Sequence, residues 1–140
     1  MTSNFIGDAL EMCRELGFRG VLLIGHIGKL VKLAGGMWNT HSRYGDCRMD
    51  ILTACAAAEG LHGGAAAEML CCATCDDALR ILQEQGLYEA VLHRLAGRID
   101  AMLPYKCGDM EAGAILFSKE YGYLCETKDA TALLCRIKED

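Results

Sequence analysis

The apolar run from Val21 to Ile24, followed at once by two closely spaced glycines, Gly25 and Gly28, limits the possible folds more than any other stretch. Four consecutive apolar residues have no polar face. Such a run is typical of a strand buried from both sides, in a parallel sheet with helices above and below. The segment from Lys29 to Ala34 then has helical apolar spacing and ends at a glycine pair. We therefore predict an α/β fold, a partial parallel-sheet three-layer domain with several helices.

The rest of the chain supplies the helices of this fold and one strand pair. Apolar residues recur at helical spacing in residues 4–16, 47–59, 65–72, 74–86, 87–103 and 128–137. Ser3 or Asn4 can cap the first helix, and a C-terminal β-hairpin is predicted from Gly113 to Cys125. A helix followed by a doubly buried strand is half of a βαβ unit. We therefore expect a single domain over residues 1–140, whose sheet has further strands upstream of this chain.

The glycine turn is the first candidate site. In α/β sheets, ligands bind beyond the carboxyl ends of the strands, and a helix N-terminus there attracts anions. Lys29 adds a full positive charge in that first turn, and Lys32 follows on the same predicted face. An anionic ligand group, such as a carboxylate or a phosphate, fits this arrangement. The alternative is structural, since turns need glycines and lysines commonly lie on a solvated face.

Two histidines lie beside this turn. His41 follows Thr40 in a polar loop that also contains Asn39 and Ser42, where histidine can act as an acid, a base or a ligand, or can simply hydrogen-bond the loop. His26 lies within the turn, where its ring can line a ligand site or cap the following helix. The sequence contains no complete catalytic constellation and neither a dinucleotide-binding glycine motif nor a P-loop.

Charge and cysteine content narrow the function classes. The net charge of −5, from 14 basic and 19 acidic residues, argues against a nucleic-acid partner. No apolar run is long enough to span a bilayer and no signal peptide is present, so we expect a cytoplasmic protein with no membrane partner. The nine cysteines are expected to be reduced thiols, many of them buried as small hydrophobic residues. The pair Cys72 and Cys75 forms a CxxC that leaves a metal or redox module open, although no second ligand pair accompanies it and no metal site is predicted.

The same stretch resembles a known family. GHIGKLVKLAGG followed by NTHS is similar to the signature of the cobalt-precorrin-5B C(1)-methyltransferase family of anaerobic cobalamin biosynthesis, the CbiD family. SNFIG near the N-terminus matches in the same order, and the resemblance extends to about Glu126. The matching positions are Asn4, Gly7, Gly25, His26, Gly28, Lys29, Lys32, Gly36, Thr40 and His41.

The resemblance implies an activity and a larger protein. Members of the family transfer a methyl group from S-adenosylmethionine to carbon 1 of cobalt-precorrin-5B, and they carry an N-terminal domain and further strands upstream of the matching part. This chain would then be the C-terminal portion of such an enzyme, inactive alone if the upstream part binds the methyl donor. Within it, His41 is the candidate catalytic residue, and the candidates for binding the tetrapyrrole substrate are Gly25, His26, Gly28, Lys29, Lys32 and Thr40. The alternative is a non-catalytic domain that binds a tetrapyrrole carboxylate. No oligomeric state is predicted.

Overall fold

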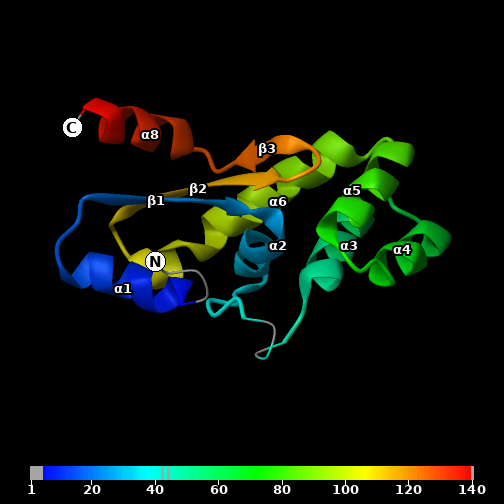
Figure 1. Cartoon of the computed structure of the whole chain (residues 1–140), viewed down its shortest axis with the longest axis horizontal. Coiled ribbons are helices and arrows are strands. Elements are labelled where there is room, and N and C mark those ends of the chain that lie inside the picture. The colour runs from blue at the N-terminus through cyan, green and yellow to red at the C-terminus, as the bar shows by residue number, and fades with distance from the viewer. Residues whose placement is uncertain (1–4, 42, 44, 140) are drawn as a thin grey trace.

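A computed structural model describes residues 5–41, 43 and 45–139 and shows an α/β fold with a small mixed sheet (Figure 1). The helices are α1 (Ile6–Glu15), α2 (Ile27–Leu30), the 3-10 helix η1 (Val31–Gly35), α3 (Arg48–Ala58), α4 (Gly63–Leu70), α5 (Cys75–Glu84), α6 (Tyr88–Met102), α7 (Pro104–Cys107) and α8 (Ala130–Glu139). The strands are β1 (Gly20–His26), β2 (Glu111–Ser118) and β3 (Gly122–Glu126). None of the helices in this described part is long and apolar enough to cross a membrane.

The sheet has the order β1-β2-β3, with β1 parallel to β2 and β3 antiparallel to it. Helix α8 lies over one face, which we call the outer face, while α2, α6 and α7 pack on the inner face (Figure 1). The predicted three-layer arrangement and the C-terminal hairpin are therefore confirmed. Helices α3, α4 and α5 extend the inner layer beyond the end of the sheet (Figure 1).

The prediction that the strand after Arg19 is buried from both sides is wrong. Ile24 is 58% exposed, whereas Leu116 on the neighbouring strand is fully buried. Two causes are visible. Strand β1 is an edge strand, and α8 covers only its beginning, where a Cβ on Gly20 would lie 2.9 Å from the Leu133 side chain. Among the described residues, no helix covers the outer face near the end of β1.

The turn and helix expected after this strand also differ. Strand β1 continues through Gly25 to His26, which pairs with Phe117, and α2 begins at the next residue. The predicted helix 29–34 is split, because after one α-helical turn the chain tightens into η1. Four consecutive η1 residues are buried, since η1 passes between α3 and α6. An exposed amphipathic helix would have buried only one side of this segment.

The remaining helices lie close to the predicted positions because local signals set their ends. Thr74 caps α5 by accepting a hydrogen bond of 3.1 Å from the Asp77 N–H. Gly36 ends η1 in the left-handed conformation, with φ of 77°. Helix α4 begins two residues earlier than predicted, and α7, which opens at Pro104, was not predicted. The proposed caps Ser3 and Asn4 lie outside the described residues.

Candidate functional site

A cavity of about 350 Å³ opens where β1 leads into α2, at the predicted edge of the sheet. Its lining comes from α2, η1, the loop before α3 and the first residue of α3; the residues are Gly28, Lys29, Lys32, Thr40, His41, Asp46 and Arg48. We call it the α2–α3 cavity. The structure thus brings together five of the seven predicted site residues. Three cationic side chains and one carboxylate line it, which gives the cavity a formal excess of positive charge.

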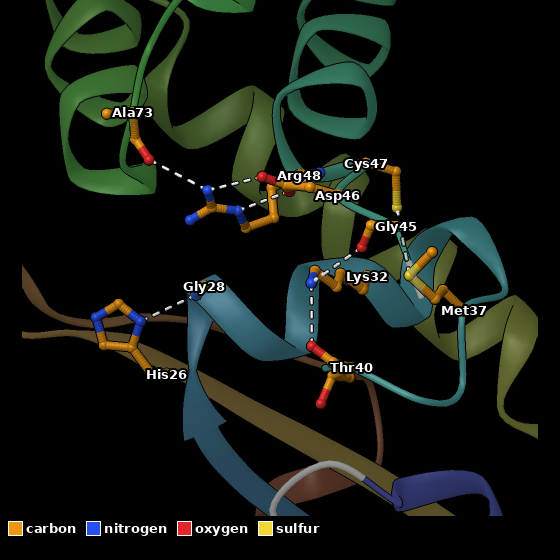
Figure 2. A network of polar contacts seen from close by, with 10 residues as sticks. All are labelled: His26, Gly28, Lys32, Met37, Thr40, Gly45, Asp46, Cys47, Arg48 and Ala73. Carbon is orange, nitrogen blue, oxygen red and sulfur yellow. Dashed lines mark hydrogen bonds and ion pairs between the residues drawn. The ribbon is translucent and has the colours of Figure 1, made fainter. Parts of the chain in front are cut away.

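Lys32 is the buried cation of this cavity. It is 3% exposed, and its Nζ donates to the Thr40 carbonyl at 3.0 Å and to the Gly45 carbonyl at 3.5 Å (Figure 2). The alternative that Lys29 and Lys32 both lie on a solvated helix face does not hold for Lys32, because the tight coil of η1 turns this side chain into the protein. None of the ion pairs among the described residues involves Lys32. A buried cation is usually paired with a carboxylate, so this one can still accommodate an anion.

The wall of the cavity opposite Lys32 contains an ion pair between Asp46 and Arg48, which we call the clasp. The guanidinium donates from Nε and Nη2 to the two carboxylate oxygens at 2.8 and 2.9 Å, and Nη2 also donates to the Ala73 carbonyl at 3.2 Å (Figure 2). Hydrogen bonding to Arg48 lowers the pKa of Asp46 to about 2, and the charge of Lys32 contributes in the same direction. The clasp joins the cavity to the loop before α5. Sequence reasoning missed Arg48, although a D-x-R spacing at a predicted helix start signals this kind of pair.

His41 lies at the exposed rim of the cavity and is held by its own loop. Its backbone N–H donates to Asn39 Oδ1 at 3.2 Å, and its Nδ1 accepts from the Arg43 N–H at 3.1 Å. When the ring is neutral, an accepting Nδ1 places the proton on Nε2. The Nε2–H, on the other side of the ring, is then a hydrogen-bond donor. Ser42, which belonged to the predicted polar loop, lies outside the described residues.

Gly25 and His26 do not line this cavity. The His26 Nδ1 accepts from the Gly28 N–H at 2.9 Å and so caps α2 (Figure 2), as one of the two sequence alternatives predicted. Its ring meets Phe117 edge-on, with ring centroids 5.9 Å apart. Gly25 leaves room for Leu30, whose side chain would lie 3.2 Å from a Cβ at that position. Both residues therefore shape the strand-to-helix junction.

Another matching residue, Gly7, fixes the loop that carries the cavity. A Cβ on Gly7 would lie 2.7 Å from the Trp38 Cβ, closer than real Cβ contacts allow. The Gly7 N–H donates to the Trp38 carbonyl at 3.1 Å, and Phe5 forms a β-bridge with Asn39. The start of α1 thus holds the loop that leads into Thr40 and His41.

The cysteines differ in burial. Burial raises the pKa of Cys72 and raises that of Cys75 to about 11, whereas a reactive redox thiol usually has a lowered pKa. No group of three or more potential metal ligands occurs within residues 5–41, 43 and 45–139. With Cys75, four of the nine cysteines are buried, the others being Cys55, Cys107 and Cys125, whereas Cys71 and Cys135 are exposed.

A larger cavity of about 590 Å³ lies along α6, but its lining contains two carboxylates, Glu59 and Glu89, beside its two arginines. Arg94 pairs with Glu59 at 2.5 Å, and Arg98 donates to the Ala34 carbonyl at 3.5 Å. These contacts join α6 to α3 and η1. The α2–α3 cavity, in contrast, contains a buried cation without a carboxylate partner among the described residues, so it is the better anion site.

Comparison with known proteins agrees with the sequence resemblance. The family described as "CbiD, C-terminal domain" matches residues 39–128. The chain belongs to this family. The matched region of the CbiD C-terminal domain begins at the loop of the α2–α3 cavity and extends to the end of the hairpin.

Three curated relatives of this CbiD C-terminal domain are each named cobalt-precorrin-5B C(1)-methyltransferase. The protein from Tolumonas auensis is 38% identical over 119 residues, which are 83% of this chain and 32% of the relative. The protein from Alkaliphilus metalliredigens is 36% identical over 139 residues, 99% of this chain and 37% of the relative. The protein from Listeria welshimeri is 34% identical over 134 residues, which are 94% of this chain and 36% of the relative. The chain thus spans about a third of the length of these relatives. No solved structure matches it.

Proposed function

We propose that the chain is the C-terminal part of a cobalt-precorrin-5B C(1)-methyltransferase and that its α2–α3 cavity binds a carboxylate of the tetrapyrrole substrate. The observation that carries the proposal is the buried Lys32 ammonium, which faces a cavity with an excess of cations and has no carboxylate partner among the described residues. The relatives' name supplies the substrate and the reaction.

The chemistry of the substrate suits this cavity. Cobalt-precorrins carry carboxylates around the macrocycle, and a carboxylate accepts charge-assisted hydrogen bonds from lysine and from a neutral Nε2–H. Ligand pockets commonly measure about 300 to 1,000 Å³, and at about 350 Å³ this one is small. It suits one carboxylate arm, with the ring itself outside. Lys29, which is exposed, would meet the arm at the rim, and Lys32 would meet it in the interior.

Methyl transfer depends chiefly on holding the nucleophilic carbon and the methyl donor in line. Binding a carboxylate that lies at a distance from carbon 1 orients the macrocycle and lowers the entropic part of the activation barrier. In this proposal His41 donates from Nε2 to the substrate. A catalytic role for His41 stays a prediction, to be tested by the effect of its substitution on turnover.

We infer that the methyl donor is S-adenosylmethionine and that it binds mainly outside this chain. The donor's sulfonium is cationic, and the α2–α3 cavity, whose lining is itself cationic, repels it. We therefore assign the donor site to the rest of the methyltransferase and expect the isolated chain to have no turnover.

The second candidate is a non-catalytic domain that binds a tetrapyrrole carboxylate. The cavity favours this reading in one respect: its polar groups are mostly hydrogen-bond donors, and its one carboxylate is committed to Arg48. Both candidates use the same site. They differ in whether the site supports turnover when the remainder of the enzyme is present.

A chimera distinguishes them. In the Alkaliphilus metalliredigens protein, the matched region is replaced with this chain, and methyl transfer to cobalt-precorrin-5B is measured. We expect activity in the chimera, with KM raised by Lys29→Ala and unchanged by Lys119→Ala, an exposed lysine in the β2–β3 turn. A folded but inactive chimera that still binds substrate would favour the binding domain. Full activity in both the Lys29→Ala and the His41→Ala chimera would show that the α2–α3 cavity is not part of the substrate site.

A further inference from the structure

The outer face of the sheet carries an uncovered apolar surface at the carboxyl ends of β1 and β2. Gly20 faces α8, and side chains alternate along a strand, so Ile24 and His26 also point to the outer face. Their register partners on β2 are Ile115 and Phe117. We call Ile24, Ile115 and Phe117, together with the His26 ring, the outer sheet-end surface. Ile24 is 58% exposed and Phe117 is 39% exposed, so water covers apolar area here.

This surface adjoins the α2–α3 cavity through His26. Gly28 lines the cavity, and its N–H donates to His26 Nδ1 at 2.9 Å (Figure 2). On its other side, the His26 ring meets the Phe117 ring edge-on. The cavity and the outer sheet-end surface therefore share the junction between β1 and α2, and one ligand can contact both.

The two regions differ in chemistry, because the cavity has an excess of cations and the surface is apolar. The acid next to the surface, Glu126, lies opposite Ile115 on β3, the strand farthest from β1. Its carboxylate accepts hydrogen bonds from the hydroxyls of Tyr123 and Thr131. Contiguous exposed apolar residues mark interaction sites, and a cationic cavity beside them is complementary to a ligand that has an apolar body and an anionic rim.

A carboxylated tetrapyrrole has this distribution of apolar area and charge. Its conjugated ring has two flat apolar faces, and its carboxylates project from the rim. The α2–α3 cavity, at about 350 Å³, takes one arm and leaves the ring outside. A ring held by that arm meets the adjoining apolar surface, where Ile24 packs against its face and Phe117 makes an offset or edge-on aromatic contact.

We propose that one face of the tetrapyrrole macrocycle packs on the outer sheet-end surface while one of its carboxylate arms is bound in the α2–α3 cavity. The inference rests on the proposed function and adds a surface for the ring to the site for the arm. In the transfer, an electron pair of the ring carbon forms the new C–C bond along the normal to the ring, and the methyl–sulfur bond breaks with its electron pair left on sulfur. Covering one face leaves the other open to the methyl donor, so this surface selects the face that is methylated.

Nuclear magnetic resonance of the chain with a porphyrin octacarboxylate tests the position of the ring. The ring current of a porphyrin shifts the signals of protons above its face upfield. We expect the Ile24 methyl signals to move upfield as the porphyrin saturates the chain. The methyl signals of Leu70 on α4, which lies far from β1 (Figure 1), should stay in place. Tricarballylate, a linear tricarboxylate without a ring, probes the carboxylate site alone and should leave the Ile24 signals unchanged.

Paired substitutions make the test specific. Ile24→Thr keeps a β-branched side chain in the strand and should leave the melting temperature within about 3 °C, since the side chain is exposed. It should raise Kd for the porphyrin about threefold to tenfold, because less apolar area is buried, and leave Kd for tricarballylate unchanged. Leu70→Thr, at an aliphatic residue that is 50% exposed, is the matched control and should change neither Kd.

Failure of this inference differs from failure of the carboxylate site. If Lys29→Ala weakens binding of both probes while the Ile24 signals stay in place and Ile24→Thr binds the porphyrin as the wild type does, the carboxylate site stands and the ring surface is wrong. If Lys29→Ala weakens neither probe, or the porphyrin does not bind, both proposals are overturned. A concentration-dependent dimer that shields Ile24 without porphyrin would assign the surface to a second copy and overturn the inference alone.

Discussion

Replacing Lys32 with methionine tests whether the buried ammonium holds the loop of the α2–α3 cavity. Methionine keeps the length and most of the apolar contacts of the lysine stem. The substitution removes the donor that reaches the Thr40 carbonyl at 3.0 Å. Thr40 is 4% exposed, so its carbonyl loses a partner in a site with little access to water.

The magnitude follows from two opposing terms. The favourable term is the hydrogen bond to a charged group, which contributes about 1.5 to 3 kcal/mol. Removing the buried charge restores part of the stability lost with the hydrogen bond, because the desolvation penalty of the ammonium disappears. The contact with the Gly45 carbonyl, at 3.5 Å and at an exposed residue, adds little. We expect Lys32→Met to lower the free energy of unfolding by about 1 to 3 kcal/mol.

Urea unfolding followed by circular dichroism measures this difference, with Lys119→Met as the control at an exposed lysine. The control should change the unfolding free energy by less than about 0.5 kcal/mol. If Lys32→Met is as stable as the wild type, or more stable, the ammonium does not anchor the loop. The argument for a preformed anion site would then lose its main support.

Three further outcomes are expected. Gly7→Ala should lower the free energy of unfolding by about 1 to 3 kcal/mol, because its Cβ would collide with the loop tryptophan; unchanged stability in urea would show that the loop moves freely. The Asp46 pKa of about 2 lies below its ordinary 3.8, so its ion pair stabilises the fold above about pH 4 and is lost as the pH falls toward 2. Asp46→Asn should therefore flatten the pH dependence of stability between pH 4 and 2, and an unchanged profile would contradict the clasp. In brief iodoacetamide treatment at pH 8, mass spectrometry should find the exposed Cys71 and Cys135 modified before the buried Cys75, whose pKa is about 11; equal rates would contradict its burial.

Local signals explain which parts of the fold the sequence predicted. Helix α5 was predicted with its correct N-cap because Thr74 and the following acids act within one turn. The hairpin was predicted because β-branched and aromatic residues flank a glycine-containing turn. The cavity was predicted in part, since the end of β1 and the start of α2 are adjacent in sequence and bring Gly28 and Lys29 to one edge of the sheet.

Long-range packing explains the failures. Lys32 is buried because α3 and α6 enclose η1, and α6 lies more than fifty residues away in the sequence. Ile24 is exposed because β1 is at the edge and α8 stops short of its end, neither of which an apolar run reveals. Arg48 was missed because its roles depend on a loop carbonyl at Ala73 that comes close only in the folded chain.

The most direct test of the carboxylate site is titration of the isolated chain with a porphyrin octacarboxylate, followed by porphyrin fluorescence. We expect saturable binding that weakens as salt is added, because exposed charges contribute. Lys29→Ala should raise Kd about fivefold to tenfold, equivalent to about 1 to 1.4 kcal/mol, and Lys119→Ala should leave it unchanged. No binding, or binding that both variants retain equally, would contradict the assignment of the α2–α3 cavity to the substrate carboxylate.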